Sequence, residues 1–144
     1  MPEIAFHFNA PDKLAYACRF LRKALRHGCQ VLVVAPPALL PVLDEQLWHM
    51  QPQDFVAHAV EGCEAELWRL SPIALASSTD GAPHQDVLLN LGAGIPAGFE
   101  RFARVVEVVS AHDMSDRQLA RQRWRDYQAG GHALIRHDLV QQGS

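Results

Sequence analysis

Two uninterrupted apolar runs constrain the fold of this chain more than any other feature of its sequence. Residues 30–35 are Gln-Val-Leu-Val-Val-Ala and residues 86–91 are Asp-Val-Leu-Leu-Asn-Leu. They lack the alternation of apolar and polar side chains that is expected of a strand exposed on one face. Continuous runs of this kind are typical of strands buried on both faces of a parallel sheet. Further strands are predicted at residues 3–8, 73–76 and 104–110.

Helical segments alternate with these strands. Residues 13–27 repeat apolar side chains at helical spacing, and Gly28 is positioned to cap the C-terminus of that helix. Helices are also predicted at residues 39–50 and 115–128, with Ser115 as the N-cap of the second. Because strands that alternate with helices form parallel βαβ units, we expect an α/β fold. The predicted architecture is a three-layer α/β/α sandwich with a mostly parallel central sheet.

Length and composition favour one soluble domain. The chain has 144 residues, of which 49% are hydrophobic, and this is enough for a continuous core. We expect a single domain over residues 1–140 and a frayed tail at residues 141–144. The net charge of -3 argues against a dedicated nucleic-acid binder, which usually carries a basic excess. The odd number of cysteines, three, argues against a disulfide framework of a secreted protein. The sequence shows neither a signal peptide nor an apolar run long enough to span a membrane, so we expect a cytoplasmic protein that does not enter a membrane.

Motifs for catalysis, metals or cofactors are weak in this sequence. The turn at Gly92–Gly98 has the spacing GxGxxxG, with Pro96 inside it, and so differs from the GxGxxG of dinucleotide-binding folds. The eight histidines form neither HxH nor HExxH, and none accompanies a CxxC motif. We therefore expect no catalytic residue, no metal and no cofactor. The glycine turn leaves a nucleotide-binding enzyme as an alternative.

The most distinctive surface is predicted on the helix at residues 115–128. Arg117, Arg121 and Arg125 are spaced i, i+4 and i+8 and form one stripe, with Trp124 at its edge. Guanidinium groups pair bidentately with carboxylates and stack on aromatic rings, and the tryptophan adds an apolar wall. This combination suits a short acidic peptide that also carries a hydrophobic residue. A solvated helix face is the alternative.

The opposite face of this helix is predicted to contact the core through Leu119, Ala120 and Tyr127. Arg123 falls near this apolar face by its helical angle. We expect its guanidinium group either to extend to solvent or to pair with a buried acid.

Four stretches, in a fixed order along the chain, carry a family resemblance. They are residues 43–48 (Leu-Asp-Glu-Gln-Leu-Trp, followed by Pro52, Phe55 and His58), residues 86–91 (followed by Pro96, Phe99 and Phe102), residues 104–109 (Arg-Val-Val-Glu-Val-Val) and residues 119–124 (Leu-Ala-Arg-Gln-Arg-Trp, followed by Tyr127 and Gly131). Together they resemble the chi subunit of bacterial DNA polymerase III holoenzyme over nearly the whole chain. The shared order, rather than any one stretch, makes the similarity specific.

The resemblance implies a non-catalytic accessory subunit of the DNA polymerase III clamp-loader assembly. It implies that the chain links this assembly to single-stranded DNA-binding protein during DNA replication. The contact would be with that protein's acidic C-terminal tail, which ends in a phenylalanine carboxylate. The residues that the resemblance implicates at the tail site are Arg117, Arg121, Trp124, Arg125 and Trp48. The psi subunit and a DNA helicase are further implied partners, and Phe55 matches an aromatic residue of the psi-binding surface. Because all the implied partners are proteins, nucleic acid would be contacted only indirectly.

Two other classes of function stay open at this point. The helices at residues 13–27 and 115–128 are both basic, and they would serve direct binding of single-stranded DNA. A purely structural bridge within the clamp loader would bind its partner subunit but not the tail peptide.

Overall fold

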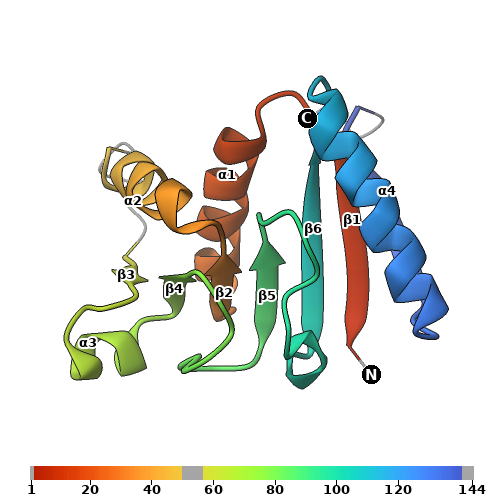
Figure 1. The fold of residues 1–144 in the computed structure, drawn as a ribbon. Coiled ribbons are helices and arrows are strands. Elements are labelled where there is room, and N and C mark those ends of the chain that lie inside the picture. Colours follow the sequence, from red (N-terminus) through yellow and green to blue (C-terminus); the bar gives the residue numbers. More distant parts are fainter. Residues whose placement is uncertain (1, 50–56, 141–144) are drawn as a thin grey trace.

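A parallel sheet forms the middle of the molecule in the computed structural model, which describes residues 2–49 and 57–140 (Figure 1). Its seven strands are β1 (Glu3–Ala10), β2 (Val31–Val34), β3 (Ala59–Val60), β4 (Ile73–Ala76), β5 (Val87–Asn90), β6 (Arg104–Ser110) and β7 (Leu134–Asp138). They lie in the order β3-β4-β2-β5-β6-β1-β7, and every neighbouring pair is parallel. The central strands β2, β4 and β5 are buried along their whole length.

Helices cover both faces of this sheet, which explains why its strands are continuously apolar. Alternate side chains of β2 mark the two sides. Val31 and Val33 pack with α1 (Lys13–Arg26) and α2 (Leu40–Trp48), whereas Leu32 and Val34 pack in the core beneath α4 (Met114–Ala129). The predicted three-layer α/β/α sandwich is therefore confirmed. Among the described residues, the other elements are α3 (Ala65–Leu70) and the short 3-10 helices η1 (Pro37–Leu39) and η3 (Phe99–Arg101).

Some elements differ from the sequence-based expectations. The patterns do not predict β3 or α3, which are only two and six residues long, and they also miss β7. The sequence of β7, Leu-Ile-Arg-His-Asp, is mixed because this strand lies at the edge of the sheet. The N-cap of α4 is Asp113 rather than Ser115, since the Asp113 carboxylate accepts a hydrogen bond from the N–H of Asp116 (3.1 Å). In the described part of the chain, no helix has the length and apolar character needed to cross a membrane.

Candidate functional site

The inner face of α4 is fastened to the sheet by a buried polar network around Glu107 of β6. The Glu107 carboxylate, which is 0% exposed, accepts hydrogen bonds from Arg123 Nε (2.9 Å) and Tyr127 Oη (2.8 Å). Asn90 Nδ2 of β5 donates to the same carboxylate, at 3.2 and 3.0 Å from its two oxygens. Burial raises the pKa of Glu107, while the positive charge of Arg123 and the donated hydrogen bonds oppose the rise. Arg123 is thus the partner of a buried acid, which was one of its two expected environments.

This network fixes the rotation of α4. The inward positions are Ala120, Arg123 and Tyr127. At a rotation of 100° per residue, the side chain of Leu119 points about 70° away from the mean direction of these three. Leu119 is 43% exposed, so its predicted contact with the core is wrong. The arginine stripe lies on the outward side, as its spacing predicts.

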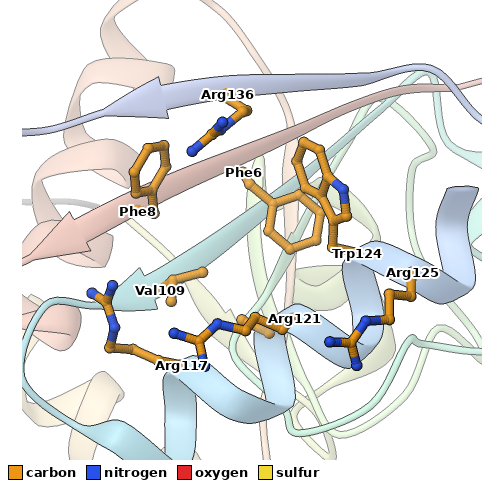
Figure 2. Close-up of a pocket in the computed structure, with 9 residues that line it drawn as sticks. Phe6, Phe8, Val109, Arg117, Arg121, Trp124, Arg125 and Arg136 are labelled. Carbon is orange, nitrogen blue, oxygen red and sulfur yellow. The ribbon is translucent and has the colours of Figure 1, made fainter.

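A groove of about 430 Å³ runs between α4 and the strands β1, β6 and β7 (Figure 2). We call it the α4 groove. It is lined by Phe6 and Phe8 of β1, Val109 of β6, Arg117, Ala120, Arg121, Trp124 and Arg125 of α4, and Arg136 of β7. The structure therefore brings four of the five predicted tail-site residues into one groove. The lining combines apolar side chains with four guanidinium groups.

Aromatic rings form the apolar part of the α4 groove. Trp124 is half-buried and packs edge-on against Phe6, with 5.1 Å between the ring centroids and 69° between their planes. The Phe6 ring also contacts Tyr127 edge-on, at 6.0 Å between centroids. This edge-to-face packing fixes the indole ring at the wall of the groove.

Two of the α4 arginines are available to an anionic ligand. Arg121 and Arg125 are exposed, and neither forms an ion pair with any residue in the described part of the chain. Arg117 is held more firmly, because one guanidinium nitrogen donates to Asn9 Oδ1 (3.0 Å) and to the carbonyl oxygens of residues 110 and 111 (3.4 and 3.3 Å). The guanidinium of Arg117 is therefore pre-positioned at one end of the groove.

The fourth guanidinium group comes from β7. Arg136 lies across the groove from the α4 arginines in Figure 2, and its guanidinium carbon is 5.1 Å from the centroid of the Phe8 ring. Phe6 and Phe8 point to one face of the sheet because side chains alternate along β1. The alternation of residues 4, 6 and 8 is a sequence signal that could have identified the two phenylalanines. Arg136 had no such signal, since β7 was not predicted.

The structure does not bring Trp48 to the α4 groove. Trp48 is the last residue of α2, and it is 58% exposed with its ring against His58 (5.7 Å between centroids). Because α2 covers the opposite face of the sheet, the sheet itself separates Trp48 from Trp124. Phe55, predicted on the surface for a second partner, lies outside the described residues.

The glycine turn at residues 92–98 does not have the form of a nucleotide-binding loop. Its backbone carbonyls accept hydrogen bonds from three side chains of the protein: Asn90 Nδ2 to Gly94 O (2.9 Å), Arg123 to Ala93 O (2.9 Å) and Thr79 Oγ1 to Ala97 O (2.5 Å). The turn leads into the three-residue 3-10 helix η3, rather than into an α-helix whose N-terminus would hold a pyrophosphate. Among the residues that the structure describes, no three His, Cys, Asp or Glu side chains come together as metal ligands.

Comparison with known proteins gives a family match. The family model described as DNA polymerase III chi subunit, HolC, matches residues 1–135 of the chain. A search of curated proteins found no match.

Proposed function

Because the chain belongs to the DNA polymerase III chi subunit family, we propose that its α4 groove binds the acidic C-terminal tail of single-stranded DNA-binding protein. The family is an accessory subunit of the polymerase, and the chain accordingly has an accessory role in DNA replication. In the proposed function, tail binding links the clamp-loader assembly to the protein that coats single-stranded DNA. The psi subunit and a DNA helicase are proposed as further partners, bound elsewhere on the chain.

One observation supports this proposal above the others. Four guanidinium groups, from Arg117, Arg121, Arg125 and Arg136, surround a groove with aromatic rings along its wall. A tail of acidic residues that ends in a phenylalanine carboxylate has the complementary chemistry. Its carboxylates would accept bidentate hydrogen bonds from the arginines, while its terminal phenyl ring would pack against Trp124 and Phe8.

The expected affinity follows from these contacts. A well-placed arginine–carboxylate bond contributes roughly 1.5–3 kcal/mol, and less where solvent screens it, as at the exposed Arg121 and Arg125. Burial of one phenyl ring adds about 1.5–3 kcal/mol. Part of this free energy is lost in ordering a disordered tail, so we expect a micromolar dissociation constant.

The direct test is a fluorescence anisotropy titration with a labelled acidic peptide that ends in phenylalanine. We expect Arg121→Ala/Arg125→Ala to weaken binding by about two- to thirtyfold, because each lost solvent-exposed contact is worth about 0.2–1 kcal/mol. Arg136→Ala should weaken it as well. Affinity should fall as salt rises, since the arginines are exposed.

A charge-matched control is available on the other face of the sheet. Arg19→Ala/Lys23→Ala removes the same formal charge from exposed positions of α1 and should leave peptide affinity unchanged, as should Trp48→Ala. A peptide with alanine in place of the terminal phenylalanine should bind more weakly to every one of these proteins. Equal affinity of the wild-type protein and Arg121→Ala/Arg125→Ala for the peptide would exclude the α4 groove as the tail site.

A further inference from the structure

A second groove, of about 540 Å³, lies on the opposite face of the sheet beside α1. We call it the α1 groove. His7 of β1 and His137 of β7 form its floor with Arg104 of β6, while Arg19 and Lys23 of α1 stand over it. No aspartate or glutamate is among the described residues that line it. The groove therefore concentrates three permanent positive charges in a chain whose net charge is -3.

The cations of the α1 groove are open to a ligand. Arg19 and Lys23 are exposed, and within residues 2–49 and 57–140 neither forms an ion pair. Arg104 Nε lies 3.9 Å from Glu3 Oε1, with both side chains about half exposed (45% and 55%). Such a long, solvated pair is weak and leaves the Arg104 guanidinium free to turn to another anion.

The positive charges of the α1 groove act together on His7, one of the residues that line it. Burial is the main cause that lowers the pKa of His7 to about 4, and the positive charges of His137, Arg104 and Lys23 contribute to the same shift, in that order of importance. These cations come from three different elements, so their fields overlap at the position of the His7 ring. A site of this kind attracts an anionic group, and the oxygens of a phosphate can pair with more than one of these cations at once.

Aromatic side chains form the remaining wall of the α1 groove. Tyr16 and Phe20 of α1 are half-buried, and both contact the His7 ring edge-on, at 5.8 and 5.9 Å between centroids. The Arg19 guanidinium lies 5.9 Å from the centroid of the Tyr16 ring. Cations interleaved with aromatic rings are the elements with which proteins bind unstacked nucleotides, since the cations contact phosphates and the rings contact bases.

We propose that the α1 groove binds a phosphate group of single-stranded nucleic acid, with the attached nucleoside against Tyr16 and Phe20. Arg19, Lys23 and Arg104 contact the phosphate oxygens. A single strand is favoured over a duplex because a concave site of this volume admits one unstacked nucleotide, whereas the bases of a duplex stay stacked. The site fits the work of a polymerase accessory subunit, and it does not depend on tail binding in the α4 groove.

The test is a fluorescence anisotropy titration with a short labelled oligothymidylate and the full chain. Arg19→Ala/Lys23→Ala should raise the dissociation constant by about tenfold, and Arg121→Ala/Arg125→Ala should leave it unchanged. The slope of log affinity against log salt should also fall by about 0.7 for each phosphate contact removed, an effect that a merely structural role would not produce. Arg104→Gln, on a different element, provides a second variant.

Competition arms identify the source of the phosphate. An unlabelled single strand should displace the probe, while duplex DNA of the same length should displace it far less effectively. Displacement by inorganic phosphate or thymidine monophosphate at concentrations as low as those of the oligonucleotide would mean that the groove binds a free phosphate compound, and this would overturn the nucleic-acid assignment. Displacement by the acidic peptide, together with loss of binding in Arg121→Ala/Arg125→Ala, would mean that nucleic acid occupies the α4 groove. No binding of the oligothymidylate at low salt would also overturn the proposal.

Discussion

The buried pair between Arg123 and Glu107 provides the sharpest test of the packing of α4. Arg123→Met keeps an unbranched side chain and removes the charge. The fully buried Glu107 carboxylate would then retain only Asn90 and Tyr127 as hydrogen-bond donors. Removing one partner of a buried ion pair costs about 3–5 kcal/mol, because the other charge is left without compensation. We expect a loss of that size in the free energy of unfolding near pH 8.

The same loss should depend on pH. The folded-state pKa of Glu107 is raised above its unfolded value of 4.5 by burial, and removing the charge of Arg123 raises it further. The folded variant therefore holds a proton that the unfolded chain releases, so its stability falls as pH rises from 4.5 through the folded-state pKa. Once Glu107 is protonated, the remaining loss comes from the two hydrogen bonds of Arg123, to Glu107 and to the Ala93 carbonyl. These bonds are worth about 1 kcal/mol each, which gives a loss of about 2 kcal/mol at acidic pH.

Urea unfolding, followed by circular dichroism at about pH 5 and about pH 8, measures both quantities. Arg121→Met is the matched control, because Arg121 lies on the same helix but points to solvent, and it should change stability by no more than about 0.5 kcal/mol. Comparison with the wild-type protein at each pH cancels the contribution of every other titrating group. A loss below about 1 kcal/mol near pH 8, or an equal loss at both pH values, would refute the view that Arg123 compensates a buried carboxylate.

Three further predictions concern single positions. Gly98 has φ 85°, and a Cβ at this position would lie 2.6 and 2.7 Å from two neighbouring side-chain atoms, whereas Gly131 has the same φ with open space around it. Gly98→Ala should therefore lower the free energy of unfolding more than Gly131→Ala does, and urea titration measures the difference. Burial raises the pKa of the Cys18 thiol to about 11, so this thiol should stay unmodified when the native protein reacts with iodoacetamide near pH 8. The half-buried Cys63 should be alkylated under the same conditions, and peptide mass spectrometry distinguishes the two sites. The pKa of His7 is lowered from 6.5 to about 4, mainly by burial, so between these pH values the unfolded chain binds a proton that the folded chain does not. Stability should therefore fall as pH drops from 6.5 to 4. The fall, measured from urea midpoints, should be smaller in His7→Gln.

The layered fold could be predicted from the sequence because its central strands are buried on both sides. Residues 31–34 and 87–90 contact helices on both faces, so their side chains are apolar without alternation. The edge strand β7 has no such requirement. Its residues include Arg136 and His137, and its pairing partner β1 comes from the opposite end of the chain. Local patterns carry no information on a pairing of that kind.

The candidate site could be predicted only where one helix carries it. Helical spacing alone places Arg117, Arg121 and Arg125 on one face of α4, and this placement does not depend on how the other elements pack. The family resemblance, rather than helical spacing, assigns Trp48 to the same site. Trp48 lies on α2, which packs on the opposite side of the sheet from α4. The crossover connections of the whole sheet determine on which side a helix packs, and the spacing of residues within one helix carries no information about them. Arg123 is the intermediate case, since its angle predicts an inward side chain but not which acid it meets.

The edge strand β7 has one further consequence. Arg136 and His137 are consecutive, and because neighbouring side chains of a strand point to opposite faces, the first lines the α4 groove and the second lines the α1 groove. In the described part of the chain β7 pairs with β1 alone, so it can detach by breaking a single ladder of backbone hydrogen bonds. Such local opening requires less free energy than global unfolding, and it would dismantle both grooves in the same event. Amide hydrogen exchange in β7 therefore reports, in one measurement, how often the two faces of the sheet lose a wall together.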